Sequence, residues 1–524
     1  MQTKQRFAFH PLLFAIYPVA FYYIHNIREV RFSETLGAFA FSILGTVMLY
    51  TILWRLLKNG AKAALVATIA LFMFYSFKQF TDISFQLLGN TALAGIAKQR
   101  YFTTVWTLAL LAFCAAATAS RINYSAVTSI LNLSSIVLIA LPLFSIKTSL
   151  PAAVKEWNAG RLKKIELLSS AKPEKTRINP PPDIYYLIFD RFPNNKTLEQ
   201  YFNSDVNHLI TGLESKGFYV PEKSICNYPH TPLSIASLLN MEYIDLPENV
   251  KATNSYSPIK TMMQDSAARR FLLPYGYKWV NLGSKSLPTN YNPLAYYDKS
   301  NVRKGIINEF SLYVFNSTLA FPYWDKIFRI QKTNRLRMLQ HIRDLEEMPT
   351  FIEGPKFVLF HALLPHPPVI FRYDGALLSN EELSALGAKK AFVGQVIYTS
   401  GKMLEIADEL LSQYPENRKP IIVMQSDEGP LAHYYSLPDH KADIRCRNFS
   451  ALYLPGLTES ERKALPEDMS NVNTLRLIFN LYFGANYPLL ENKCYFNEEI
   501  STGPKRNRTL NQYIFKDITR QIKW

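Results

Sequence analysis

Acidic residues follow two of the apolar segments in the second half of the chain. Asp190 ends the run IYYLIFD, and Asp427 and Glu428 follow the run PIIVMQS. Taken alone, Asp190 reads as a turn residue or helix cap and the acidic pair as a polar turn. If both runs are parallel strands, however, their carboxyl ends share one edge of the sheet, where ligands bind and oxygens can converge on a hard cation. The three residues are therefore candidate metal ligands.

A threonine and two histidines could carry out the chemistry itself. Thr231 and Pro232 open the stretch TPLSIASLLN and read as a helix N-cap and first helical residue. A hydroxyl at a helix N-terminus is also where negative charge on an attacked phosphate or sulfate is best tolerated. His361 and His366 lie in HALLPHPP, after another apolar run, although histidines are also common in surface turns.

These residues are spread through an alternation of apolar runs and helical patterns. The clearest strands are predicted at 184–189, 356–364, 420–426 and 449–456. Helical periodicity is plain at 197–215, 334–347, 388–414 and 473–482. Such an alternation predicts an α/β domain with a largely parallel central sheet covered by helices on both faces.

Five apolar runs precede this domain, at 9–24, 36–57, 61–77, 102–119 and 127–146. Most of them approach the ~20 residues that a helical membrane span needs. We therefore expect residues 1–146 to form a bundle of about five transmembrane helices. Basic residues such as Lys4, Lys58 and Arg121 slightly favour a cytoplasmic N-terminus. An odd number of spans then places the rest of the chain outside the cytoplasm.

The remainder of the chain divides where its composition changes. Residues 147–182 are basic and helix-prone and end in three prolines, which predicts a juxtamembrane helix and a linker. The α/β domain is expected at 183–496, and a basic tail at 497–524.

The net charge of +16 is concentrated after the last apolar run and in the C-terminal tail, where it suits anionic lipid headgroups. The sequence has no Arg-Gly segment and no zinc-finger spacing, so nucleic acid is not an expected partner. One of the four cysteines, Cys114, lies in an apolar run. The other three, Cys226, Cys446 and Cys494, can form at most one disulfide among them.

The order and placement of these motifs resemble the alkaline phosphatase/sulfatase superfamily, in particular its membrane-anchored transferases. The resemblance covers essentially the whole chain and is carried by DIYYLIFD, TPLSIASLLN, HALLPHPP and QSDEGP. That branch includes lipoteichoic acid synthases and the phosphoethanolamine or phosphoglycerol transferases of bacterial envelopes, with about five spans before the catalytic domain. It implies a multi-pass protein of the bacterial inner membrane whose catalytic domain is periplasmic or otherwise extracytoplasmic.

The resemblance also implies roles for the candidate residues. By motif, Asp190 and Asp427 match metal ligands, and Thr231 matches the threonine that is both ligand and nucleophile. His361 and His366 are similar to a pair of histidines that line the substrate site in the phosphoethanolamine branch. One divalent ion is the expected cofactor.

The chain departs from the family pattern at Glu428, which stands where the family has a histidine. A carboxylate can still bind zinc or manganese, so Glu428 remains a candidate ligand and the ion is expected to be one of these two. His433 or His440 could supply a further contact, and no spacing rule chooses between them. The stretch at Cys226 lacks a C/S-x-P-x-R arrangement, which disfavours sulfate-ester hydrolysis of the formylglycine type.

The leading hypothesis is transfer of a phosphoethanolamine or phosphoglycerol substituent from a phospholipid to an envelope glycan or lipid through a threonine-linked intermediate. A phosphodiesterase or other sulfatase-like hydrolase, in which water resolves the same intermediate, is the second hypothesis. A non-catalytic envelope scaffold with the same fold is the third, and the replacement at Glu428 keeps it open.

The basic residues that flank the apolar runs predict a C-terminus outside the cytoplasm, and this can be tested. A C-terminal fusion to an alkaline phosphatase reporter should be active, and a fluorescent-protein fusion at the same position should be dark, because both report an extracytoplasmic C-terminus. A bright fluorescent fusion with an inactive phosphatase reporter would contradict the predicted orientation.

Overall fold

The computed structural model describes most of the chain. Residues 7–27, 30–88, 99–120, 122–144, 152–169, 176–252, 256–285, 289–300, 308–320, 323, 330–435, 437, 442–497 and 513–524 are described. The chain forms two compact units. The first combines Met1–Ser149 with Val302–Ile330, and the second combines Leu150–Asn301 with Gln331–Trp524.

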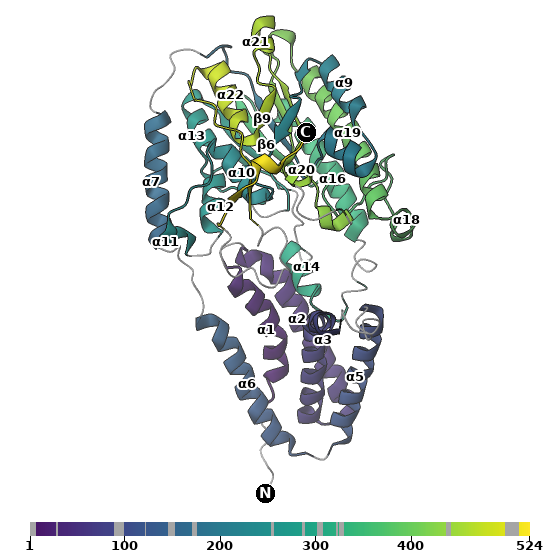
Figure 1. Cartoon of the computed structure of the whole chain (residues 1–524). Helices are drawn as coiled ribbons and strands as arrows, with labels where there is room; N and C mark the ends of the chain where they lie inside the picture. Colours follow the sequence, from purple (N-terminus) through teal and green to yellow (C-terminus); the bar gives the residue numbers. More distant parts are fainter. Residues whose placement is uncertain are drawn as a thin grey trace. The chain divides into compact units, whose positions relative to one another are not determined.

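The first unit is built from long helices (Figure 1). These are α1 (His10–His25), α2 (Phe32–Leu57), α3 (Gly60–Leu88), α5 (Gln99–Ala119) and α6 (Tyr124–Phe144). Among the described residues, α2, α3, α5 and α6 are each long and apolar enough to cross a membrane. The helix α1 has 16 residues and is shorter, although it packs against α2, α3 and α6.

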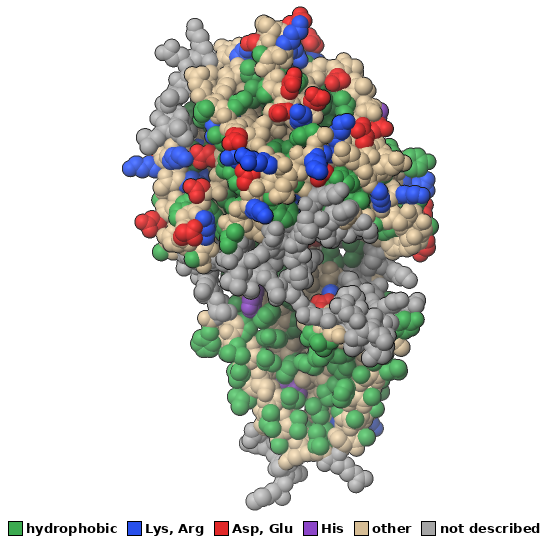
Figure 2. Space-filling model, viewed as in Figure 1, with side chains coloured by type: hydrophobic (Ala, Val, Ile, Leu, Met, Phe, Trp, Pro, Cys, Tyr) green, Lys and Arg blue, Asp and Glu red, His purple; other side chains and the backbone are tan. Residues whose placement is uncertain are grey.

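The surface of these helices supports a membrane location. Large apolar side chains such as Leu44, Leu111 and Leu133 are exposed along them. Figure 2 shows hydrophobic side chains gathered over this unit, whereas Lys, Arg, Asp and Glu are scattered over the α/β unit. So much exposed apolar surface is unfavourable in water and is expected where lipid covers it.

A segment from the middle of the chain also belongs to the first unit. Its helix α14 (Glu309–Phe315) is capped by Asn308, whose side-chain nitrogen donates to the Glu34 carbonyl at 2.6 Å. Phe310 and Phe315 join a buried apolar cluster with Ala38 of α2 and with residues of α1 and α3. The sequence patterns did not indicate that this segment leaves the α/β domain.

The second unit is an α/β fold around a seven-stranded sheet. The strand order is β2-β8-β7-β1-β6-β4-β5. The strands are β1 (Ile184–Phe189), β2 (Phe218–Tyr219), β4 (Lys278–Leu282), β5 (Tyr297–Asp298), β6 (Lys356–Ala362), β7 (Ile421–Gln425) and β8 (Ser450–Tyr453). The pairs β1/β6, β1/β7, β4/β6 and β4/β5 are parallel. Only β8 pairs antiparallel, with β7 and β2, so the prediction of a largely parallel sheet is confirmed.

Helices cover both faces of this sheet, as predicted. Tyr186 and Ile188 of β1 enter one core with α10 (Thr231–Asn240), α12 (Ser257–Gln264), α13 (Ala267–Leu272) and α22 (Asn471–Phe483). Tyr185 and Leu187 enter the opposite core with α9 (Asn207–Ser215), α16 (Ile330–Glu346) and α19 (Ala388–Ser412). Alternate residues of a strand point to opposite faces, so a strand apolar throughout must be buried on both.

The predicted helix at 197–215 is interrupted. It consists of α8 (Asn195–Thr197), a π-helical turn (Leu198–Phe202) and α9. Between them Asn203 has a φ of 51°, in the left-handed region, which ends the first part. Helical segments do form on both sides of Asn203. The apolar pattern does not reveal a residue in the left-handed region, which ends a helix.

The helix α7, five short helices and two small sheets complete the described part of the second unit. The helices are α7 (Ala152–Ser169), α11 (Glu248–Lys251), α17 (Met348–Phe351), α18 (Asn380–Leu386), α20 (Ala442–Cys446) and α21 (Glu459–Lys463). Short 3-10 turns lie at Leu273–Tyr275, Glu416–Arg418, Ala432–Tyr435 and Thr519–Gln521. Two small sheets pair β3 (Lys223–Ile225) with β9 (Asp468–Ser470) and β10 (Tyr495–Phe496) with β11 (Lys516–Asp517).

Candidate active site

Asp190 and Asp427 come together because their strands are neighbours. Asp190 directly follows β1 and Asp427 lies two residues beyond β7, and these two strands are parallel. Both side chains are fully buried or nearly so. The backbone N–H of Arg191 donates to Asp427 Oδ1 at 3.0 Å, which ties the two turns together. Arg191 has a φ of 62°, in the left-handed region, so the chain turns sharply at this point.

His361 reaches the same place from the other side of β1. It lies near the end of β6, in register with Ile188, and its Nε2 is 3.5 Å from Asp190 Oδ2. Its other ring nitrogen, Nδ1, is 2.7 Å from Thr289 Oγ1 and 3.0 Å from Ser284 Oγ. If Nδ1–H donates to these hydroxyls, the lone pair of Nε2 is left for a cation.

Three atoms of this cluster are buried and have no hydrogen-bond partner among the residues that the structure describes. They are Asp190 Oδ1, His361 Nε2 and Asp427 Oδ2. The three side chains offer ligand atoms that all lie within 4.8 Å of one another. A buried polar atom left unsatisfied costs about 1–3 kcal/mol, and one divalent ion would satisfy all three. Two carboxylate oxygens and one imidazole nitrogen suit zinc or manganese, so these residues could hold the ion.

The pKa values of the two aspartates also favour a cation between them. Burial raises the pKa of Asp427 well above its usual range, and the charges of Asp190 and Glu428 raise it further. Burial also acts to raise the pKa of Asp190, but His366, His361 and Arg191 outweigh it and lower that pKa. One ionised carboxyl therefore opposes ionisation of the other. A cation between them would allow both to be charged.

Glu428 lies in the same site but is already paired. Its Oε1 accepts from Arg191 Nε at 3.0 Å, and its Oε2 accepts from Arg445 Nη2. Burial acts to raise the pKa of Glu428, but Arg445 and Arg191 outweigh it and hold that pKa below its ordinary value. Glu428 is not part of the Asp190–His361–Asp427 group. Its ion pairs with Arg191 and Arg445 give it a second possible role besides that of the predicted metal ligand.

Sequence reasoning missed both arginines. Arg191 could have been noticed, because it directly follows Asp190 at the end of β1. Arg445 had no signal, since it lies in the short helix α20, 17 residues beyond Glu428. Its guanidinium also donates to the carbonyls of Gly429 at 3.1 Å and Pro229 at 2.6 Å. Arg445 thereby connects the turn after β7 to the chain that enters α10.

Thr231 faces the acidic residues from the start of α10. Its Oγ1 is 3.4 Å from Glu428 Oε1. Burial raises the pKa of Asp427, and the Thr231 hydroxyl opposes a small part of this rise. Ser234, one turn later, donates to the Asp427 carbonyl at 2.7 Å and fixes the helix against β7. The predicted N-cap was wrong by one residue. His230 is the N-cap, with no side-chain capping bond, and Thr231 is the first helical residue.

His366 lies beside the acidic cluster and is half-buried. Burial lowers the pKa of His366, and the charge of Asp190 partly opposes this shift. Its loop is held by Gln395, whose Nε2 donates to the Pro365 carbonyl at 3.0 Å. The side chain of His433 and the whole of His440 lie outside the described residues.

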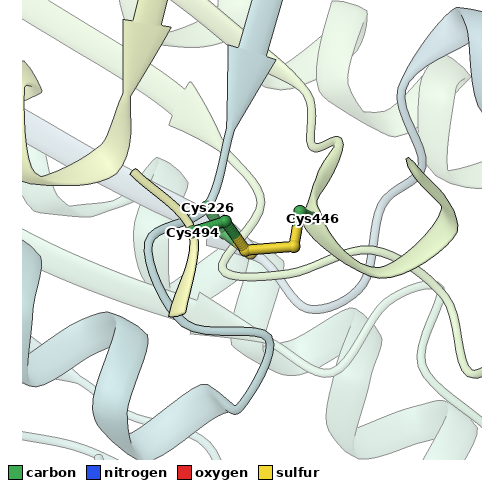
Figure 3. Close-up of side chains that lie close together, drawn as sticks. All are labelled: Cys226, Cys446 and Cys494. Atoms are coloured by element: carbon green, nitrogen blue, oxygen red, sulfur yellow. A yellow bond between two sulfur atoms is a disulfide. The ribbon is translucent and has the colours of Figure 1, made fainter. Parts of the chain in front are cut away.

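A disulfide braces this part of the fold. Cys446, which follows Arg445, is bonded to Cys494, and Cys226 lies beside the bond (Figure 3). The Cys226 thiol is free and buried, and its backbone N–H donates to the Cys446 carbonyl at 2.8 Å. The prediction of at most one disulfide among these three cysteines is confirmed.

Comparison with known proteins gives structural likeness only. No family model matches the sequence, and no curated protein matches it. The periplasmic domain of EcEptC from Escherichia coli aligns with 12% identity and a TM-score of 0.40, over 66% of this chain and 95% of that domain.

Full-length lipooligosaccharide phosphoethanolamine transferase A from Neisseria meningitidis aligns with 10% identity and a TM-score of 0.38, over 90% of this chain and 95% of that protein. A putative sulfatase from Bacteroides thetaiotaomicron aligns with 12% identity and a TM-score of 0.36, over 62% and 76% of the two chains. These three similar structures are thus two phosphoethanolamine transferases and one putative sulfatase. Likeness at this level does not assign an activity.

The cluster geometry predicts which residues hold the ion. Asp190→Asn, Asp427→Asn and His361→Gln should each lose bound metal, measured by mass spectrometry of the purified protein, because each removes a ligand. Glu428→Gln should keep the metal, although it leaves two buried arginines without a carboxylate and should cost about 3–5 kcal/mol of stability.

His341→Gln is the matched control. His341 is also buried, and its Nε2 is 3.3 Å from the His361 carbonyl, but its side chain is not part of the cluster. This variant should retain the ion. Metal retained by His361→Gln and lost from Glu428→Gln would establish Glu428 as the ligand instead.

Proposed function

We propose that this chain is a metal-dependent phosphotransferase. It transfers a phosphoethanolamine- or phosphoglycerol-type substituent from a phospholipid to an envelope glycan or lipid. The observation that carries the proposal is the buried group of Asp190, His361 and Asp427 with the Thr231 hydroxyl facing it. Two acids, an imidazole and a hydroxyl at a helix N-terminus are the parts that phosphoryl chemistry needs.

In this proposal Asp190, His361 and Asp427 hold zinc or manganese. When bound, the ion would draw negative charge from a phosphate oxygen and favour ionisation of a nearby hydroxyl. The charges of the two aspartates would balance the two positive charges of the ion, and the histidine would add a neutral nitrogen ligand.

Thr231 is the proposed nucleophile. Its Oγ1 attacks the phosphorus of the donor lipid, so the Oγ1–P bond forms while the bond from phosphorus to the lipid oxygen breaks. The hydroxyl proton leaves toward Glu428 Oε1, which is 3.4 Å away. His366 gives a proton to the departing lipid alkoxide. An acceptor hydroxyl then attacks the phosphorus and gives its proton to His366, so that the bond from phosphorus to the acceptor oxygen forms while the Oγ1–P bond breaks. Thr231 takes back the proton held by Glu428 as it leaves.

The two arginines have supporting roles in this scheme. Arg191 and Arg445 keep Glu428 ionised, and Arg191 also lies 3.8 Å from Asp190 through its Nε. Arg191 is the more accessible of the two paired guanidiniums, with 14% of its side chain exposed. It could therefore contact a substrate phosphate when one is bound.

The apolar helices of the first unit suit a lipid donor, which could react without leaving the bilayer. We place the protein in a bacterial inner membrane with the α/β unit on the periplasmic side. Water acting in place of the acceptor would make the same site a phosphodiesterase. Mass spectrometry of envelope glycolipids from cells with and without the protein separates the two, because only transfer adds ethanolamine phosphate or glycerol phosphate to an acceptor.

The role of Thr231 as nucleophile can be tested with a side chain of the same shape that lacks the hydroxyl. Thr231 makes no helix cap, so Thr231→Val preserves the fold and should lower turnover of a phospholipid donor at least 10³-fold. Thr231→Ser keeps a hydroxyl and should retain part of the activity. Intact-mass analysis of the wild type with donor should show a phospho-adduct on the peptide containing Thr231.

Ser237→Ala is the control on the same helix. The Ser237 hydroxyl donates to the Glu242 carbonyl, away from the acidic cluster, and its loss should cost about 1 kcal/mol of stability without changing turnover. An active Thr231→Val enzyme would show that another group attacks the phosphorus.

A further inference from the structure

A separate cavity lies at the opposite end of α10 from Thr231. Its volume is about 250 Å³. Its walls include Arg161 and Lys164 of α7, Asn240 at the end of α10, and Arg476 of α22. Because α10 spans ten residues at 1.5 Å each, its two ends are roughly 14 Å apart. The cavity is therefore distinct from the acidic cluster.

The helix α7 is part of this wall because it packs on the α/β unit. Val154 and Ile165 are buried in the same core as α12 and α13. The sequence predicted a helix here at the membrane surface. In the structure one face of the helix is covered by the α/β unit, and Arg161 and Lys164 line the cavity.

The guanidinium groups of Arg161 and Arg476 are held by hydrogen bonds to uncharged oxygens. Arg161 Nη1 donates to Asn240 Oδ1 at 2.9 Å, and its Nη2 donates to the Asp265 carbonyl at 2.9 Å. Arg476 Nε donates to the Met241 carbonyl at 2.6 Å, and its Nη1 donates to the Pro488 carbonyl at 2.7 Å. Such bonds orient a guanidinium without cancelling its charge.

No carboxylate within the described residues is hydrogen-bonded to either arginine. The nearby Asp265 carboxylate is taken by Arg269 at 3.2 Å and Arg270 at 2.6 Å. The acidic residue of the wall is Glu242, which pairs with the exposed Lys164 at 2.9 Å. Three basic side chains against one acidic side chain leave an excess of two positive charges. Charges held this way are costly unless a ligand compensates them.

The remaining walls are apolar or aromatic. Met241, Met262 and Ile165 line the cavity, and the guanidinium of Arg476 lies 5.7 Å from the centre of the Tyr487 ring. A ligand for this site therefore has a negative group for the arginines and a compact remainder that contacts apolar atoms and a ring. A cation would be repelled, and a neutral ligand would leave the guanidiniums uncompensated.

We propose that this cavity binds a phosphate-bearing group, either a phospholipid headgroup or a small phosphate ester. Two arginines converging on one cavity match the several acceptor oxygens of a phosphate. The site would hold its ligand apart from the catalytic cluster, so it is a second binding site and does not depend on the proposed transfer reaction.

The experiment is calorimetric titration of the full-length protein in neutral detergent at low salt. The metal is removed by chelation, so that the acidic cluster does not contribute. The titrants are inorganic phosphate, glycerol 3-phosphate and a short-chain phosphatidylglycerol. Stronger binding of the lipid identifies a headgroup site, and equal or stronger binding of the small phosphates identifies a soluble ester. The absence of saturable binding by all three would overturn the proposal.

Three variants test the location. Arg161→Gln should weaken binding about tenfold or more, because it removes a charge-assisted hydrogen bond. Lys164→Gln should weaken it about threefold, since this side chain is exposed and screened. Glu242→Gln should strengthen it, because the negative charge in the wall is lost. A variant that merely disturbed the fold would not improve affinity, so this increase separates binding from structure.

Lys163→Gln is the matched control, since Lys163 is exposed on the same helix and does not line the cavity. It should bind as the wild type does, and so should Thr231→Val. Equal weakening by Lys163→Gln and Lys164→Gln would mean diffuse surface attraction and would overturn the site, as would any failure of Glu242→Gln to strengthen binding. Loss of transfer activity with intact phosphate binding would affect the proposed function alone.

Discussion

Two carboxyl groups, those of Asp190 and Asp427, are buried side by side at the ends of adjacent parallel strands. Their mutual repulsion in a dry environment is the constraint around which the site is built. His361, the Arg191 backbone and side chain, and the Thr231 hydroxyl all approach these carboxyls. Even so, one oxygen of each aspartate has no hydrogen-bond partner among the described residues. A divalent ion is the simplest group that resolves all of these features together.

The repulsion between buried carboxylates also bears on Glu428, which follows Asp427. Glu428 adds a third buried negative charge, which forms ion pairs with Arg191 and Arg445. The ion pairs let Glu428 be retained without being a metal ligand. The replacement that kept a non-catalytic scaffold open in the sequence is therefore compatible with a working site, because its charge is compensated.

Much of the α/β unit was predictable because its signals are local. The runs around Ile184 and Ile421 are apolar at every position, which indicates strands buried on both faces, and the parallel sheet then places Asp190 and Asp427 at one edge. The strand order was not predictable, so the apolar pattern did not show that β6 borders β1. Only the family resemblance placed His361 in the same site as Asp190. Arg445 could not be found either, since its pairing with Glu428 depends on the path of the chain between them. The N-cap of α10 was misplaced by one residue because Thr231 and Pro232 fit either register.

The most direct test of the central claim is a crystal structure of the full-length protein with zinc or manganese, in which anomalous scattering locates the ion. The account predicts one peak about 2.0–2.2 Å from a carboxylate oxygen of Asp190, from Nε2 of His361 and from a carboxylate oxygen of Asp427. Glu428 should remain paired with Arg191 and Arg445. An ion bound by Glu428 without His361, or no ion between the two aspartates at saturating metal, would contradict it.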